Sequence, residues 1–269
     1  MLVSIQDRMS QKVKVIIPVY RSFFGELEEE SFVQCHAVLS NYDIVLVQPE
    51  GLDTNFITGK YPKVQVEYFP KTYFQSIDGY NELLLSATFY ERFIESDFIL
   101  IYQLDAFVFS DQLAQWCAKD YDYVGAPWIA TQEKFLLKQI NALLKPFKSH
   151  RTKRRDVIFY KVGNGGFSLR KTASHFKVAT EQKDAIKKLL ADKERDLCAI
   201  EDVFWSIRVP ELYPNFKIPL YQEALGFAMD RKPELAMKLN NNQMPFGCHG
   251  INKNKVTHFW KPLLQQYKK

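Results

Sequence analysis

Short apolar runs alternate with helix-like segments along the first 110 residues. The runs are rich in β-branched and aromatic residues and stop at prolines or turn residues, which predicts strands at 12–19, 43–48, 64–69 and 98–109. Between them, apolar residues recur with helical spacing over 26–40 and 77–94. This β-α-β-β-α-β order predicts an α/β fold with a mostly parallel central sheet flanked by helices.

The run from Phe98 to Phe109 carries a single acidic residue, Asp105, among apolar neighbours. The uninterrupted apolar stretch before it is typical of a strand that is covered on both faces. A carboxylate in such surroundings is costly unless it meets a cation, a metal or hydrogen-bond donors. Asp105 is therefore either a structural cap for a helix starting near Ser110, or a ligand at the carboxyl end of a strand, where open α/β sheets place their sites.

The second half of the chain is less regular. Its patterns predict helices at 111–118, 134–144, 172–180, 182–191 and 201–207, and short strands at 121–125 and 157–160. Residues 216–269 are rich in loop-forming types. The chain has 269 residues and 46% hydrophobic composition, enough for a substantial core, and no low-complexity linker divides it. We expect a single domain over residues 1–269.

Composition narrows the class of protein. The net charge of +5 is only mildly basic and gives no reason to expect nucleic-acid binding. The four cysteines are widely spaced without a CxxC pair, which favours reduced thiols over a disulfide framework or a zinc site. Residues 1–12 lack the apolar run of a signal peptide, and no window approaches the ~20 apolar residues of a membrane span. We therefore expect a soluble, cytoplasmic protein.

A basic run, KPFKSHRTKRR, covers residues 145–155. A charge run with few apolar residues is commonly a solvated loop. The same run could also form an electrostatic patch for a phosphate-bearing acceptor or an anionic lipid surface. The second interpretation would bring the protein into peripheral contact with a membrane.

Three glycines lie within four positions at Gly163, Gly165 and Gly166, with Asn164 between them. The segment is neither GxGxxG nor a P-loop, since it lacks the GK[ST] end. Glycines permit positive φ and close approach of a ligand to the backbone. The segment is therefore either a ligand-contacting turn that leads into a strand, or a structural hairpin or bulge.

Two adjacent acids, Glu201 and Asp202, precede the aromatic residues Phe204 and Trp205. Acids at a helix start are often capping residues. Alternatively, one of them is a general base at the rim of a pocket, with Trp205 as an apolar wall for a sugar ring. Further on, His249 lies between Gly247 and Gly250 and is either structural or a second metal ligand beside Asp105.

Taken in order, these segments resemble glycosyltransferases of the GT-A fold over roughly residues 13 to 250. VIIPVY (15–20) looks like their first strand, and QPEGLDT (48–54) looks like a degenerate DDGS-type turn. YQLDAF (102–107) occupies the position of the DxD motif, with Gln103 in place of the first acid. The YQLDA and GNGGFSLR signatures also resemble an uncharacterised bacterial family of glycosyltransferase-like proteins.

The later segments extend this resemblance. GNGGFSLR (163–170) looks like the glycine pair and strand that line the donor sugar and acceptor, and EDVFW (201–205) is similar to the motif whose Asp acts as base in inverting members. FGCHG (246–250) resembles the late segment with the metal-binding histidine. The resemblance implies a nucleotide-binding half at about 13–110 and an acceptor-binding, catalytic half at about 111–260.

The resemblance also implies an activity: inverting transfer of a sugar from a nucleotide sugar, with UDP-sugars favoured, to a hydroxyl of a glycan or lipid-linked acceptor. Mn²⁺ or Mg²⁺ would be held by Asp105 and His249, and the expected role is in bacterial surface polysaccharide synthesis, at the inner face of the cytoplasmic membrane. The implied base is Asp202, with Glu201 beside it. The implied donor contacts are Pro18, Tyr20, Glu50, Gln103, Asp105, Gly165 and Gly166, and the acceptor contacts are Trp128, Trp205 and Asn164.

Two other classes remain open. A nucleotidyltransferase would share the α/β core and acidic metal ligands but would transfer the nucleotidyl group instead of the sugar. A catalytically inactive module that binds nucleotide sugars would account for the imperfect DxD segment, but not for the intact EDVFW segment.

Overall fold

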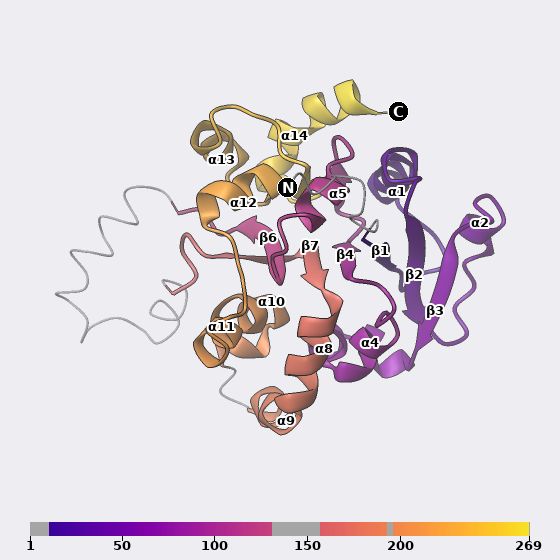
Figure 1. The fold of residues 1–269 in the computed structure, drawn as a ribbon. Helices are drawn as coiled ribbons and strands as arrows, with labels where there is room; N and C mark the ends of the chain where they lie inside the picture. The colour runs from indigo at the N-terminus through magenta and orange to yellow at the C-terminus, as the bar shows by residue number, and fades with distance from the viewer. Residues whose placement is uncertain (1–10, 131–156, 193–195, 269) are drawn as a thin grey trace, which may run out of the picture.

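The computed structural model of the chain describes residues 11–130, 157–192 and 196–268 (Figure 1). The helix predicted over 134–144 and the basic run at 145–155 lie outside the described residues. Among the helices that are described, none combines the length and the apolar composition needed to cross a membrane.

The described residues form a central six-stranded sheet in the order β3-β2-β1-β4-β7-β6. The strands are β1 (Val13–Pro18), β2 (Asp43–Pro49), β3 (Gln65–Phe69), β4 (Phe98–Tyr102), β6 (Tyr123–Pro127) and β7 (Val162–Lys171). The pairs β1–β2, β2–β3 and β1–β4 are parallel, whereas β7 runs antiparallel to both β4 and β6. The predicted α/β fold with a mostly parallel sheet is therefore confirmed.

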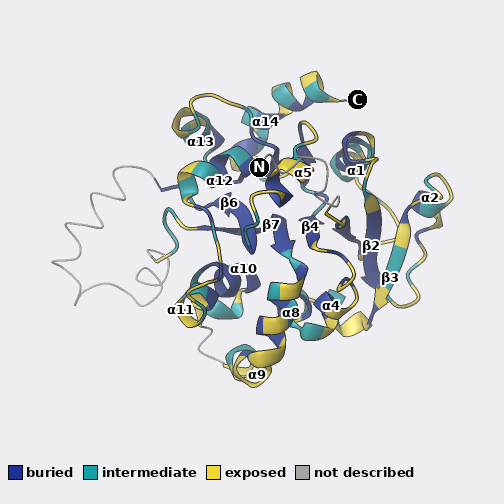
Figure 2. Cartoon of the chain, viewed as in Figure 1, coloured by how far each residue is buried: buried dark blue, intermediate teal, exposed yellow. Residues whose placement is uncertain are grey.

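Helices cover both faces of this sheet, so β1, β4 and β6 are buried almost throughout, whereas the edge strand β3 keeps exposed residues (Figure 2). Successive residues of β1 enter different apolar clusters: Val15 and Ile17 pack on one face and Ile16 on the other. Burial on both faces explains why the strand sequences read as continuous apolar runs. The helices of the first half are α1 (Glu26–Val38), α2 (Asn55–Thr58), the 3₁₀ turn η2 (Lys71–Phe74), α3 (Ile77–Leu85), α4 (Ala87–Glu91) and α5 (Leu113–Cys117).

The run at 98–109, predicted as one strand, is two strands in different sheets. After β4 the chain turns at residues 103–105, where the Ala106 amide donates to the Gln103 carbonyl at 2.8 Å. It then enters β5 (Ala106–Val108) of a small sheet with β9 (Gly247–His249) and β8 (Ala228–Met229). Both strands are apolar, so composition alone hid the turn between them.

The prediction that the tail is loop-rich was wrong. Residues 216–269 contain α12 (Tyr221–Phe227), α13 (Pro233–Leu239) and α14 (Asn254–Tyr267), besides β8 and β9. Helix α14 buries Val256, Trp260 and Leu264, which lie four residues apart on one face. Pro262 within this helix weakened its sequence signal, because proline is unfavourable in a helix interior.

Other boundaries differ locally from the predictions. The helix predicted over 77–94 is interrupted at Ser86, whose hydroxyl accepts from the Phe89 amide at 3.2 Å and so begins α4. The strand predicted at 157–160 is a turn. The helices predicted at 172–180 and 182–191 are α8 (Thr172–Glu181) and α9 (Lys183–Ala191), and the one at 201–207 is α10 (Glu201–Val203) followed by a π-helical segment, η5 (Phe204–Arg208). Two short elements were not predicted, the 3₁₀ turn η4 (Leu197–Ala199) and α11 (Val209–Leu212).

A buried ion pair fixes α10 against β7. The Arg170 side chain is completely buried, and its Nη2 and Nη1 lie 3.1 and 3.0 Å from the two carboxylate oxygens of Glu201. Arg170 also donates to the Tyr90 hydroxyl at 2.9 Å and the Ser168 hydroxyl at 3.1 Å. An ion pair that includes a hydrogen bond, here from Arg170 Nη2 to Glu201 Oε1, restricts the orientation of both partners. It sets the position of α10, and with it that of Asp202.

Removing one partner of this pair should destabilise the fold strongly. Arg170→Met leaves Glu201 buried without its cation, and we expect the unfolding free energy to fall by about 3–5 kcal/mol. The double variant Arg170→Met/Glu201→Gln removes both charges and should recover part of this loss. Urea unfolding followed by circular dichroism measures both effects. A single variant within about 1 kcal/mol of the parent chain would show that the pair is not a structural anchor.

Candidate functional site

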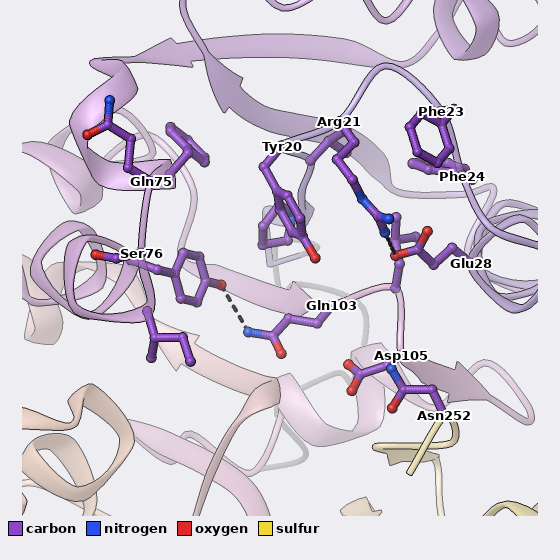
Figure 3. Close-up of a pocket in the computed structure, with 16 residues that line it drawn as sticks. Tyr20, Arg21, Phe23, Phe24, Glu28, Gln75, Ser76, Gln103, Asp105 and Asn252 are labelled. Atoms are coloured by element: carbon purple, nitrogen blue, oxygen red, sulfur yellow. Dashed lines mark hydrogen bonds and ion pairs between the residues drawn. The ribbon is translucent and has the colours of Figure 1, made fainter. Parts of the chain in front are cut away.

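A cavity of about 420 Å³ opens at the carboxyl ends of β1 and β4 (Figure 3). Strands β1, β2 and β3 follow one another to one side, and the chain then crosses to place β4 on the other side of β1. The cavity therefore lies where the strand order reverses, which is where open α/β sheets bind their ligands. Of the predicted donor contacts, Pro18, Tyr20, Gln103 and Asp105 line the cavity.

The cavity has an aromatic side and a polar side. Tyr20 and Phe23 follow β1, and each is 58% exposed, so their rings remain available to a ligand. Arg21 forms an ion pair with Glu28 of α1 at 2.5 Å. Gln103, whose Nε2 donates to the Tyr80 hydroxyl at 3.3 Å, and Asp105 point in from the turn after β4 (Figure 3). The cavity thus offers planar faces for a ring and oxygen groups for a cation or hydroxyls.

Three polar side chains meet beside this cavity: Gln103 and Asp105 line it, and His249 is buried next to them. The turn after β4 places Gln103 and Asp105 next to each other, and the β5–β9 pairing sets His249 opposite Ala106. His249 Nε2 lies 3.0 Å from Asp105 Oδ1 and 3.1 Å from Gln103 Oε1. The structure therefore brings together Asp105 and His249, which were predicted as metal ligands, and adds the Gln103 amide oxygen.

Asp230, which no sequence pattern indicated to us, lies behind His249. Its Oδ1 is 3.3 Å from His249 Nδ1 and 2.9 Å from Lys253 Nζ, and its Oδ2 is 3.3 Å from Asn164 Nδ2. The carboxylate is almost completely buried. A signal was present in the sequence: Asp230 directly follows an apolar strand, β8, and Asp105 comes three residues after the end of β4.

The two carboxylates change the protonation of His249. Burial lowers its pKa, but the hydrogen bonds and negative charges of Asp105 and Asp230 outweigh burial and raise the pKa to about 9. Burial raises the pKa of Asp230, yet His249 and Lys253 bring it down to about 2. At neutral pH, His249 is therefore a cation whose Nε2 proton lies between the oxygens of Gln103 and Asp105.

This arrangement fits a divalent cation. The described residues contain no group of three or more His, Cys, Asp or Glu side chains gathered for a metal. The candidate set instead joins one carboxylate, one imidazole and one amide oxygen, all donor types that Mn²⁺ or Mg²⁺ accepts. The position now held by the Nε2 proton of His249 is where such a cation would bind, since metal ligation requires neutral imidazole.

The glycine segment makes room for the side chains of the site. A Cβ on Gly166 would lie 2.1 Å from His249 Nε2, and one on Gly165 would lie 2.1 Å from Glu201 Oε1 and 3.2 Å from Asp202 Cβ. Positive φ values among the described glycines occur at Gly51 and Gly250, not in this segment. The sequence predicted that a ligand would approach the glycine backbone closely. In the structure, the side chains of Glu201 and His249 make this close approach.

Asp202 and Glu201 have different environments. Both Glu201 oxygens face Arg170, and Oε1 accepts a hydrogen bond from it. Asp202 Oδ1 is buried and, like Glu201 Oε2, has no hydrogen-bond partner among the described residues. Burial and the adjacent Glu201 charge raise the pKa of Asp202 to about 7, although amide groups at Gly165 and Val203 and the Arg170 charge oppose this shift. A carboxylate with this pKa can exchange a proton near neutral pH.

The remaining predicted contacts lie in different places. Trp205 is fully buried, packs against His175 with ring centroids 4.4 Å apart and the rings tilted by 48°, and donates to the Leu84 carbonyl at 3.2 Å. The expectation that it forms a wall for an acceptor sugar is therefore wrong. Trp128 is half-buried and lies against Gly163, where a Cβ would come within 2.3 Å of its ring. Asn164 is bonded to Asp230 and to the Gly166 amide.

Glu50, predicted as a donor contact, does not line the cavity. It follows β2, and its amide donates to the Phe69 carbonyl of β3 at 3.0 Å. Strand β2 lies on the side of β1 away from β4, whereas the cavity opens between β1 and β4. The residues that line this part of the cavity, such as Tyr20, come instead from the loop after β1.

Residues 63–249 match a family described as a protein of unknown function, DUF5672. The chain belongs to this family. The segment that matches the DUF5672 family begins after β1 and β2 and ends at His249. It contains Gln103, Asp105 and His249 as well as Arg170, Glu201 and Asp202. No curated protein sequence matches the chain.

Solved structures share the fold of this DUF5672 protein. One is the glycosyltransferase GlyE of Streptococcus pneumoniae TIGR4, with a TM-score of 0.54 and 12% identity over 96% of this chain. This chain spans 60% of that GlyE chain. Another is the galactosyltransferase LgtC in complex with donor and acceptor sugar analogs, with a TM-score of 0.50 and 13% identity, covering 95% of this chain and 96% of LgtC. The chain thus has the fold of these glycosyltransferases.

The raised pKa of His249 predicts a pH-dependent stability in metal-free buffer. Folding favours the protonated imidazole, so this stabilisation is fully present below the ordinary pKa of 6.5 and is lost as pH rises through about 9. The unfolding free energy should therefore decline between these values, and less so in His249→Gln. The exposed His258 provides the control, because His258→Gln should keep the parental pH dependence. Identical profiles for both variants would contradict the assigned charge.

Proposed function

We propose that this protein is a glycosyltransferase that uses a nucleotide sugar and a divalent cation. The observation that carries the proposal is the contact of Gln103 and Asp105, which line the cavity, with the buried His249, whose Nε2 lies 3.0–3.1 Å from their oxygens. The cavity lies at the point of the sheet where α/β folds bind nucleotides. The shared fold with GlyE and LgtC supports the proposal, since both are described as glycosyltransferases.

The donor would enter with its base against the aromatic side of the cavity and its diphosphate near Asp105. We favour a UDP-sugar. Mn²⁺ or Mg²⁺ held by Asp105, His249 and Gln103 would neutralise the diphosphate leaving group. The residues of the chain bind and orient: Tyr20 offers a ring face to the donor. Gly165 and Gly166 act indirectly, because they leave room for the Glu201 and His249 side chains beside β7.

Asp202 would act as the general base. Asp202 lies beside Gly165, and His249 lies beside the next residue, Gly166. The proposed base and the proposed cation site therefore flank the same short stretch of backbone. Asp202 takes the proton of the acceptor hydroxyl as that oxygen bonds to C1 of the donor sugar, and the bond from C1 to the diphosphate oxygen breaks. Attack on the face opposite the leaving group inverts C1. The pKa of about 7 suits a base that works near neutral pH.

The acceptor would be a hydroxyl of a glycan or lipid-linked glycan, in bacterial surface polysaccharide synthesis. Half-buried Trp128, held against Gly163, provides an aromatic face on the Asp202 side of the glycine pair. Work on a lipid-linked acceptor would place the protein at the inner face of the cytoplasmic membrane. LgtC, which has the same fold, is described in complex with donor and acceptor sugar analogs.

Asp105→Ala should abolish cation-dependent binding of a nucleoside diphosphate, because it removes the only carboxylate in the candidate ligand set. His249→Ala should weaken that binding less, since one neutral ligand is lost while the charge of Asp105 stays. Calorimetry with UDP, with and without Mn²⁺, measures both. If the parent chain binds UDP equally well with and without Mn²⁺, the protein is independent of the cation and Asp105 has another role.

Asp202→Asn keeps the size of the side chain but removes its basicity. We expect kcat to fall by about 100-fold or more, with an unchanged dissociation constant for the donor. Glu201→Gln alters the ion pair with Arg170. It should lower the unfolding free energy, and it should reduce the kcat of the folded protein less than Asp202→Asn does. Product analysis by NMR completes the test: a retained anomeric configuration, or near-normal kcat in Asp202→Asn, would contradict the base, and transfer of the nucleotidyl group would identify a nucleotidyltransferase.

A further inference from the structure

Asp230 is held by groups from several separate segments. His249 belongs to β9, Asn164 to β7 and Lys253 to the segment before α14, and each lies within 3.3 Å of a carboxylate oxygen of Asp230. The Arg231 guanidinium lies 3.7 Å away. Only 2% of Asp230 is exposed. A carboxylate at this depth is costly unless its partners compensate fully, and here cations and an amide do so.

The position of Asp230 relative to His249 is specific. The two ring nitrogens of His249 face opposite directions: Nδ1 toward Asp230 at 3.3 Å, and Nε2 toward Asp105 at 3.0 Å. We propose that Asp230 is the positioning residue that orients the His249 imidazole and keeps its Nε2 directed at the cation position. This inference rests on the proposed function, because it assumes that a cation binds between His249, Asp105 and Gln103.

The physical reason is the fixed direction of the Nδ1–H bond. While Nδ1–H donates to Asp230, the lone pair of a metal-binding histidine is confined to Nε2, and the negative charge behind the ring makes that nitrogen a stronger donor to a cation. A ring flip would break this bond and turn a carbon toward Asp105. Asp230 therefore acts through His249 and does not itself reach the cavity, whose lining excludes it.

The partners of Asp230 also fix Asp230 itself. Asn164 donates to Asp230 Oδ2 through Nδ2, and its Oδ1 accepts from the Gly166 amide at 3.2 Å. Gly166 is the glycine against which His249 packs. The contacts thus close a ring of Gly166, Asn164, Asp230 and His249. If Asp230 only stabilised the segment before α14, its ion pair with Lys253 would suffice. The additional link through Asn164 to Gly166 of β7 connects Asp230 to the residues around His249.

The test measures cation binding and not activity. Mn²⁺ is titrated into the full chain with saturating UDP, and the free Mn²⁺ is followed by its electron paramagnetic resonance signal. We expect Asp230→Asn to raise the Mn²⁺ dissociation constant by about 10- to 100-fold. The matched control is Asp122→Asn, which neutralises another buried carboxylate, one bonded to the Lys217 amide and the Ser174 hydroxyl at the opposite end of the sheet. This control should bind Mn²⁺ like the parent chain.

Thermal unfolding of the same samples separates positioning from folding. Both aspartate variants are expected to unfold at lower temperature, but only Asp230→Asn should lose Mn²⁺ affinity while folded. Parental Mn²⁺ affinity in folded Asp230→Asn would overturn the inference and leave the proposed function intact. If the parent chain itself binds no Mn²⁺, the proposed cation site fails, and the role of Asp230 fails with it.

Discussion

The close packing of side chains against the β7 backbone is the constraint on which the candidate site depends. Gly165 admits Glu201, and Gly166 admits His249 and Gln103, at distances that a Cβ would prevent, and a Cβ on Gly165 would also crowd Asp202. The acid pair reaches this strand through the bond between Glu201 and Arg170, and His249 reaches it through its pairing in the small sheet. Two clusters from distant parts of the chain therefore meet at consecutive residues of one strand.

Charge compensation explains how so many ionisable groups share this region. Arg170 compensates Glu201, while His249 and Lys253 compensate Asp230 and Asp105. Burial and the neighbouring Glu201 charge raise the pKa of Asp202 to about 7, and the Arg170 charge offsets this rise only in part. The site thus separates two carboxylates by environment: Asp105 is held ionised near the cation position, and Asp202 remains able to accept a proton near neutral pH.

The alternation of strands and helices in the first half and the mostly parallel sheet could be predicted from the sequence, because buried parallel strands have a strong apolar signal. Asp105 stood out because it interrupts one of these apolar runs. The turn at 103–105 could not, since it joins two strands of the same composition. Trp205 was misplaced because an aromatic residue beside an acid pair has the same sequence signature in a pocket wall as in a core. Asp230 was missed because its partners, Asn164 and Lys253, are distant in sequence and only the fold brings them together.

The central claim is that the cavity between β1 and β4 binds a nucleotide sugar for transfer. The most direct measurement is hydrolysis of the donor over a panel of nucleotide sugars, with Mn²⁺ and with a chelator. Our account predicts that the protein cleaves at least one of these donors between C1 and the diphosphate in the presence of Mn²⁺, and that chelation stops the cleavage. Failure to cleave or bind any nucleotide sugar, or cleavage between the two phosphates, would contradict the account.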